Sequence, residues 1–144
     1  MQFITNLNFN GQCEEAFTFY AQALQAKIDG FSRYKEMPAD PAMPIPADMA
    51  DKIMHVSLSK NGQLILMGAD AVCTDFSPEF VVGTNVEICI MPDDKAESDR
   101  IFTALCAGGE VVMPMEDQFW GDYFGACKDK YGIGWMINCP GKTA

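Results

Sequence analysis

The chain has 144 residues, of which 49% are apolar and 21% are charged, and its formal net charge is −10. This length fits one domain or two small modules, and the apolar content excludes a disordered chain. The ten Lys and Arg residues are scattered, which argues against binding to nucleic acid or to an anionic membrane surface. No apolar stretch approaches the roughly 20 residues that span a bilayer, and the N-terminus does not resemble a signal peptide. We therefore expect a cytoplasmic protein.

The six cysteines are expected to be reduced. They form no Cys-x-x-Cys pair, and a chain of this length does not need disulfides to hold its core. Cys89 and Cys106 lie in apolar patterns, in which a thiol acts as a small hydrophobic group.

The first half begins with a strand pattern and continues with a helical one. Phe3 to Phe9 alternates between two faces, which predicts a strand, and Asn10-Gly11 ends it. Apolar residues at helical spacing from Gln12 to Leu24 predict a helix. A second strand is expected over residues 26–35. The buried face of the helix is expected to hold Ala16, Phe19, Tyr20, Ala23 and Leu24.

Met37 to Asp51 is predicted to be a long loop, because its four prolines each remove a backbone donor and disfavour helix at the preceding residue. Loops of this length are usually lids or linkers, and the sequence leaves open whether this one moves. After the loop, Ile53 to Ser59 and Gln63 to Met67 are predicted to form a hairpin around Asn61-Gly62.

The second half repeats this order. Asn85 to Met91 is expected to be a strand, and a helix starts at Pro92-Asp93-Asp94 and continues to about Ala107. This helix is expected to bury Ile101, Phe102 and Leu105, and three strands are expected near residues 110–115, 121–129 and 134–138.

The two halves align with a shift of roughly 81 residues, which places Leu7 opposite Ile88. The fold class is therefore predicted to be α+β, with two βαβββ modules at residues 1–75 and 80–144 that form one compact domain. A single module leaves one sheet face uncovered, so we expect the sheets to curl around a cup-shaped pocket.

Four segments carry distinctive combinations of residues: Asn6 to Tyr20, Lys52-Ile53-Met54-His55, Phe119-Trp120-Gly121 and Asp129 to Asn138. Together these segments resemble PhnB-like proteins of the vicinal oxygen chelate superfamily. That superfamily includes glyoxalase I, bleomycin resistance proteins and extradiol dioxygenases. The resemblance covers nearly the whole chain and implies paired βαβββ modules that form a cup, usually in a homodimer.

The resemblance also implies positions for a divalent metal, which superfamily enzymes typically hold with His, Gln or Glu on the first and last strands of the modules. In this chain the corresponding positions are Thr5 or Asn6, Val86 or Glu87, Met67, and its repeat counterpart Met136. Among them, only Glu87 is an ordinary ligand for a hard cation, and the two methionines suit a soft ion such as Cu(I). Glu87 with His55 would supply two of the roughly three protein ligands that catalytic zinc needs.

The remaining candidates would contact a ligand directly. His55, the only histidine, is either a hydrogen-bonded core residue or a pocket donor and general base. Asn6 and Asn8 are expected to face the cup, because Leu7 and Phe9 must face the helix. The aromatic cluster of Phe119, Trp120 and Tyr123 is either a core or dimer contact or a pocket wall that stacks on the ligand. The candidate ligand-binding residues are Asn6, Asn8, His55, Met67, Glu87, Phe119, Trp120, Tyr123 and Met136.

These observations predict a homodimer that binds a small, partly apolar molecule in the cup. They leave catalysis open, with His55 and Glu87 as the catalytic candidates and a divalent metal as the only cofactor implied. One alternative is a metal-dependent lyase or dioxygenase that uses these two residues, and another is a non-catalytic sequestration protein. PhnB-like proteins are associated with phosphonate metabolism, and the only cationic candidates for that ligand are Arg33, Arg100 and Lys128.

Overall fold

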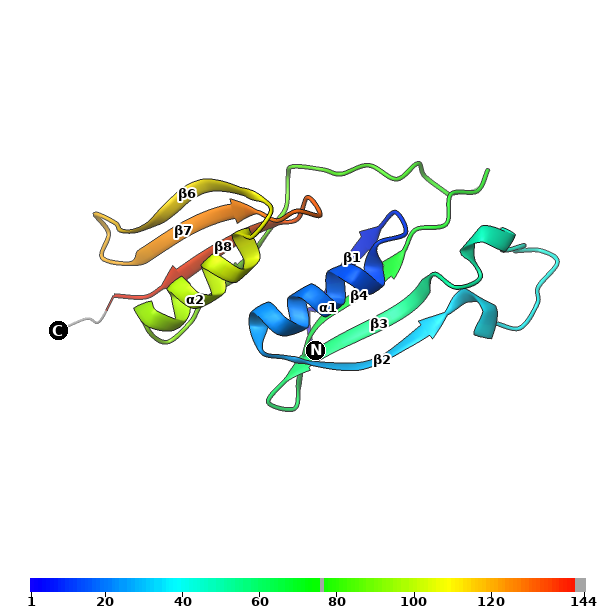
Figure 1. Cartoon of the computed structure of the whole chain (residues 1–144), viewed down its shortest axis with the longest axis horizontal. Coiled ribbons are helices and arrows are strands. Elements are labelled where there is room, and N and C mark those ends of the chain that lie inside the picture. The colour runs from blue at the N-terminus through cyan, green and yellow to red at the C-terminus, as the bar shows by residue number, and fades with distance from the viewer. Residues whose placement is uncertain (76, 142–144) are drawn as a thin grey trace. The chain divides into compact units, whose positions relative to one another are not determined.

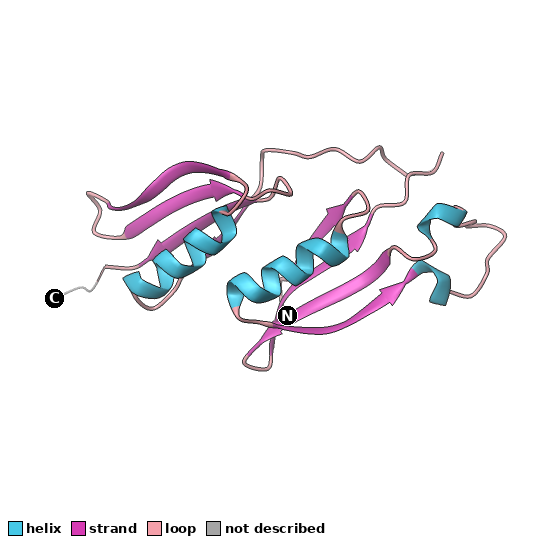
Figure 2. Ribbon diagram, viewed as in Figure 1, coloured by secondary structure: helices cyan, strands magenta, loops and turns pink. Residues whose placement is uncertain are grey.

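The computed structural model describes residues 1–75 and 77–141, and the chain divides into two compact units, Met1–Phe80 and Val81–Ala144. Each unit consists of one long helix on one face of a four-stranded sheet (Figures 1 and 2). Residues 142–144, at the end of the expected second module, lie outside the described residues.

The first unit has the strand order β1-β4-β3-β2, in which β1 is parallel to β4 and the other neighbours are antiparallel. This connectivity is a βαβββ module. Its elements are β1 (Thr5–Phe9), α1 (Cys13–Leu24), β2 (Lys27–Arg33), two 3-10 turns (Tyr34–Glu36 and Ala47–Met49), β3 (Ile53–Lys60) and β4 (Gln63–Asp70).

The second unit repeats this topology with the order β5-β8-β7-β6. The predicted α+β class with two βαβββ modules is thus confirmed, while their association into one compact domain around a cup stays a prediction. The elements of the second unit are β5 (Glu87–Ile90), α2 (Lys95–Cys106), β6 (Glu110–Asp117), β7 (Tyr123–Lys128) and β8 (Gly134–Cys139).

The core of the first unit lies between α1 and the sheet. Leu7 and Phe9 are buried on this side, as the alternation of the first strand predicted. The helix differs from its prediction, because Phe17 is fully buried and Phe19 is only half-buried. Phe17 packs over Gly68, where a Cβ atom would overlap the phenyl ring. Gly68 therefore leaves room for the Phe17 ring, and Phe17 shares its side of α1 with the buried Cys13 and Tyr20.

A buried carboxylate joins three elements of the first unit. Asp70, the last residue of β4, accepts hydrogen bonds from the backbone N–H of Cys13 and from that of Ile53, both at 2.9 Å. Cys13 begins α1 and Ile53 begins β3, so one side chain satisfies donors at the start of both elements. The hydroxyl of Tyr34 also donates to the backbone oxygen of Asp70, at 2.7 Å.

The core of the second unit is built around Trp135 on β8, which is 1% exposed. Its indole N–H donates to Asp129 at 2.8 Å, and the other oxygen of Asp129 accepts from the backbone N–H groups of Tyr131 and Ile133. The segment from Asp129 to Trp135 is therefore a structural turn motif. On α2, Ile101 and Leu105 are buried as predicted, whereas Phe102 is only half-buried.

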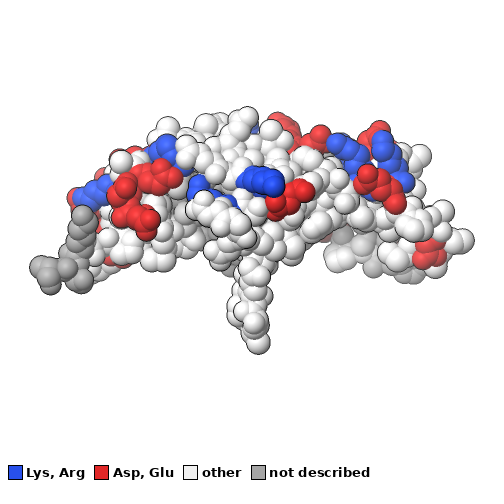
Figure 3. Space-filling model, turned by 90° about the horizontal axis from the view of Figure 1, so that it is seen from below, with Lys and Arg blue, Asp and Glu red and all other residues white. Residues whose placement is uncertain are grey.

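None of the helices within the described residues combines the length and apolar character needed to cross a bilayer. On the face of the molecule drawn in Figure 3, Lys and Arg side chains lie beside Asp and Glu side chains. Ion pairs account for part of this mixture, among them Lys35 with Asp51 and Lys95 with Asp117, each at 2.7 Å.

We predict that Asp70→Ala lowers the free energy of unfolding by about 3 kcal/mol, since each buried donor left without an acceptor costs about 1–3 kcal/mol. Urea unfolding followed by circular dichroism measures the change. The control is Asp48→Ala at an exposed position, for which a change within about 0.5 kcal/mol is expected. Equal losses in the two variants would contradict a structural role for Asp70.

Candidate functional site

The sheet face opposite α1 in the first unit carries a row of polar side chains. Asn6 of β1 pairs with Met67 of β4, and Met67 pairs in turn with Ser57 of β3. Residues that pair across neighbouring strands point to the same side of a sheet, and they alternate with the buried residues that face the helix. Asn6 is exposed, and Met67 and Ser57 are half-buried. These three side chains therefore lie together on one face.

A second row lies two residues further along the same strands. Asn8 of β1 pairs with Ala69 of β4, and His55 of β3 pairs with Ser32 of β2. Asn8 and His55 are both exposed. We name this surface the first open face, and it consists of Asn6, Asn8, Ser32, His55, Ser57 and Met67.

The first open face offers neutral hydrogen-bonding groups around one thioether. Within the described chain, no hydrogen bond or ion pair engages the side chains of Asn6, Asn8 or His55. Two carboxamides and an imidazole can each donate and accept, so they suit a ligand with several uncharged oxygen or nitrogen atoms. Met67 adds an adaptable apolar contact.

The corresponding surface of the second unit combines apolar and charged side chains. The strand pairing places Cys89 beside Met136 and Phe124 beside both Asn138 and Glu116. Met113 on β6 reaches the same side through its pairing with Ala126. We name this surface the second open face; it consists of Glu87, Cys89, Met113, Glu116, Phe124, Ala126, Lys128, Met136 and Asn138.

Met136 is not the register counterpart of Met67, which corrects the alignment of the two halves. Asn6 pairs with Met67, but Glu87 pairs with Gly134, over which the Glu87 side chain lies. Met136 pairs instead with Cys89. The reason is that the sequence shift describes the first strands and says nothing about the register of the last strand.

The aromatic residues before β7 divide between two sides of the sheet. Phe119 is 98% exposed and makes an edge contact with Trp120, with ring centroids 4.9 Å apart. Trp120 also contacts Phe124 at 6.2 Å, so these rings adjoin the second open face. Sequence reasoning missed Phe124, although its alternation with Gly125 and Cys127, which lie on the helix side of β7, contained that signal in part.

Tyr123 points to the other side, toward α2. Its hydroxyl donates to Asp99 on that helix at 2.6 Å, and Lys95 lies 4.9 Å from the ring centroid. The hydrogen bond to the Asp99 carboxylate, with smaller effects from burial and from the charges of Asp99 and Asp117, raises the pKa of Tyr123 to about 12. Tyr123 thus ties β7 to α2 and does not join Phe119 and Trp120.

The carboxylate of Asp122 lies just before β7. Asp122 accepts hydrogen bonds from the backbone N–H of Gly141 and from the Asn138 amide. These bonds, that from Gly141 first, hold the pKa of Asp122 below its usual range. The carboxylate therefore joins the start of β7 to Asn138 on β8.

The metal-site candidates are distributed over both units, with His55 on β3 of the first and Glu87 on β5 of the second. Among the described residues, no three His, Cys, Asp or Glu side chains converge on a point where they could hold an ion. Two of the three cationic candidates for a phosphonate already have acidic partners. Arg33 pairs with Glu14 at 2.8 Å and Arg100 with Glu97 at 2.7 Å.

Three solved structures share this architecture over almost their whole length. Protein PA1353 from Pseudomonas aeruginosa is 35% identical, with a TM-score of 0.83 over 99% of both chains. The PhnB protein from Bacillus cereus is 28% identical, with a TM-score of 0.72 over 96% of this chain and 99% of that one. The lactoylglutathione lyase from Agrobacterium tumefaciens, at 18% identity and a TM-score of 0.54 over 96% and 92%, shares the fold.

The paired βαβββ topology and these neighbours define a protein of the glyoxalase and bleomycin resistance fold, within the vicinal oxygen chelate superfamily. The particular family follows from the sequence. The family model described as 3-demethylubiquinone-9 3-methyltransferase matches residues 1–138, so the chain belongs to that PhnB-like family.

We predict that Asp99→Ala lowers the pKa of Tyr123 from about 12 toward the ordinary value near 10, because the acceptor and its charge are both removed. Spectrophotometric titration of tyrosinate, with Tyr123→Phe to assign the transition, measures the change. Asp93→Ala, at an exposed acid before the same helix, is expected to leave the titration unchanged. An unaltered curve in Asp99→Ala would contradict the assigned contact.

Proposed function

We propose that the protein binds a small, partly apolar molecule with uncharged hydrogen-bonding groups, and that the first open face supplies the contacts. The observation that carries this proposal is the exposed set of Asn6, Asn8 and His55 around Met67. The face presents neutral donors and acceptors in two adjacent rows, so a ligand that spans both rows can form several hydrogen bonds at once.

The chemistry of the face supports binding without requiring a reaction. A neutral imidazole can accept a proton as well as donate a hydrogen bond, so His55 would be the group to test for catalysis if a bound substrate is turned over. The superfamily includes lyases and dioxygenases, and the family description names a methyl transfer. A screen with one ligand for each of these reactions tells which type of ligand the protein binds.

The screen is a thermal-shift assay with four probes. They are catechol, the hemithioacetal of methylglyoxal and glutathione, S-adenosylmethionine, and the cationic drug bleomycin. A ligand at 100 times its dissociation constant stabilises the folded state by about 2.7 kcal/mol, which such an assay detects. Catechol fits the first open face best, because it presents two neighbouring uncharged hydroxyl groups on an apolar ring.

We predict that His55→Ala and Asn8→Ala each weaken catechol binding about 3- to 10-fold, the equivalent of one lost hydrogen bond. Titration calorimetry measures the affinity, with Gln22→Ala on the exposed side of α1 as the control. Equal affinity in all four proteins would exclude the first open face. Binding that requires Zn²⁺ and is lost in both His55→Ala and Glu87→Gln would instead support the metal-dependent alternative.

A separate measurement distinguishes a bound metal ion from the effect of the ligand. Metal analysis of protein purified without chelators is expected to give less than one equivalent of divalent metal per chain. One full equivalent of metal in the wild type that is lost in His55→Ala would favour the metal-dependent alternative over simple ligand binding. Stabilisation by bleomycin alone would favour sequestration.

We also propose that the protein forms a homodimer through the apolar surface of the second unit. The edge strand β6 exposes three consecutive apolar residues, Val111, Val112 and Met113, at 51%, 61% and 42%. An exposed apolar edge strand is an aggregation hazard that native proteins cover. A second copy of the chain is the partner that the PhnB-like resemblance favours.

We predict that the protein sediments as a dimer at micromolar concentration and that Val112→Glu shifts it toward monomer. The substitution would bury an unpaired carboxylate in the contact. Analytical ultracentrifugation measures the change, with Thr103→Glu on the exposed side of α2 as the matched control. A wild-type monomer would overturn the dimer proposal.

A further inference from the structure

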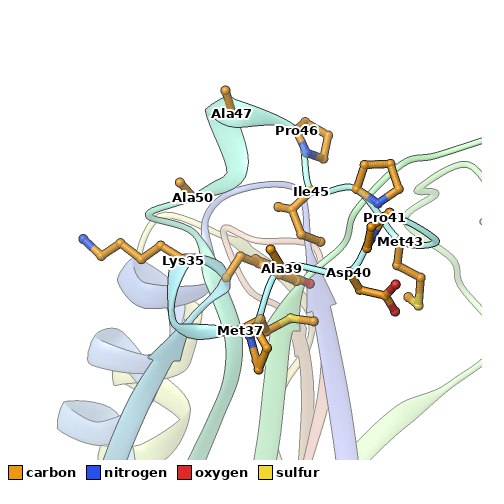
Figure 4. A pocket seen from close by; sticks show the side chains of 13 residues that line it. Lys35, Met37, Ala39, Asp40, Pro41, Met43, Ile45, Pro46, Ala47 and Ala50 are labelled. Carbon is orange, nitrogen blue, oxygen red and sulfur yellow. The ribbon is translucent and has the colours of Figure 1, made fainter.

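The proline loop, Met37 to Asp51, borders a hollow that is partly open to solvent and whose lining includes no residue of either open face. The hollow measures about 500 Å³ and lies within the first unit. This volume falls in the range of about 300–1,000 Å³ typical of small-molecule sites. Figure 4 shows the side chains of Met37 and Ile45 entering it from two segments of the loop.

The sequence explains why the loop stays open. Pro38, Pro41, Pro44 and Pro46 carry no backbone N–H, so the segment forms no α-helix or sheet strand, and its only helical turn is the 3-10 turn Ala47–Met49. A turn at Asp40 is held by its own atoms, since Oδ1 accepts from Ala42 at 2.9 Å and the backbone oxygen from Met43 at 3.0 Å. The loop therefore has local structure of its own.

The neck of the loop is closed by hydrogen bonds. Backbone N–H groups of Tyr34 and Lys35 donate to Lys52 and Ala50, at 3.1 and 2.9 Å. The guanidinium of Arg33 adds a bond of 2.7 Å to the backbone oxygen of Asp51. Because the two ends are joined before any ligand arrives, binding in the hollow would order little additional chain.

The lining is mostly apolar, and each of its two charged residues, Lys35 and Asp40, already makes a contact of its own. Figure 4 shows Lys35 directed away from the hollow, and its Nζ pairs with Asp51 at 2.7 Å. The hydroxyl of Tyr34 donates to Asp70, and Asp40 accepts from Ala42. An apolar ligand would release water from the apolar side chains of this lining, which favours its binding.

We propose that the hollow of the proline loop is a binding site for a neutral apolar ring system, such as a fused or linked pair of aromatic rings. Met37, Met43 and Ile45 would supply the contact surface, since thioethers adapt to aromatic faces. An anionic ligand is disfavoured, because Lys35 is committed to Asp51 and the chain carries a net charge of −10. This site does not rest on the proposed function of the first open face.

The test uses two fluorescent probes with the same rings. N-phenyl-1-naphthylamine is neutral, and 8-anilinonaphthalene-1-sulfonate adds one negative charge. We expect saturable binding of the neutral probe at one site per chain and at least tenfold weaker binding of the sulfonate. Ile45→Asp should weaken the neutral probe at least tenfold. The control Phe3→Asp, which changes an exposed apolar residue of the same unit, should not.

A second measurement on the unaltered protein removes any dependence on how Ile45→Asp folds. With methyl-¹³C-methionine, addition of the neutral probe should shift the methyl resonances of Met37 and Met43 and leave those of Met67 and Met136 in place. Shifts at Met67 or Met136 instead would move the probe to an open face and overturn the proposal. Absence of saturable binding, or equal loss in Phe3→Asp, would overturn it as well.

Discussion

The carboxylate of Asp70 is the contact on which the first unit depends. It ends β4 and accepts from the first residues of α1 and β3, so one buried side chain joins elements that lie 57 and 17 residues away in the sequence. This contact is made at the helix side of the sheet, where Leu7, Phe9 and Phe17 also pack. The opposite face of the sheet contributes none of these core contacts, so it can present polar groups to solvent or to a ligand.

The two units use one topology to present different surfaces. The first open face holds neutral amides, hydroxyls and an imidazole around one thioether, whereas the second combines thioether, thiol and aromatic groups with carboxylates and Lys128. A shared βαβββ scaffold does not assign a shared role, because function depends on the side chains that the scaffold positions. The polar face is suited to orienting a ligand, and the apolar edge at β6 is suited to contact with another chain.

The proline loop shows a different source of specificity. Its hollow depends on the four prolines and on a neck of backbone hydrogen bonds, and not on packing against the sheet core. A hollow made by one short segment can change its lining with few substitutions, while the module that carries it remains intact. The ligand preference proposed for this hollow would therefore be independent of the open faces.

Local patterns in the sequence determined much of this protein. The alternation at β1 predicted Leu7 inward and Asn8 outward, and the helical spacing located α1 and α2, because both periodicities depend only on neighbouring residues. The buried stripe of α1, which includes Phe17 and excludes Phe19, also follows a helical period, but the sequence alone offered a second stripe with the same spacing. Tertiary structure alone decided two other features: the pairing of Met136 with Cys89 and the turn of Tyr123 toward Asp99. Each of these depends on what a distant strand or helix places opposite the residue, and no local period encodes it.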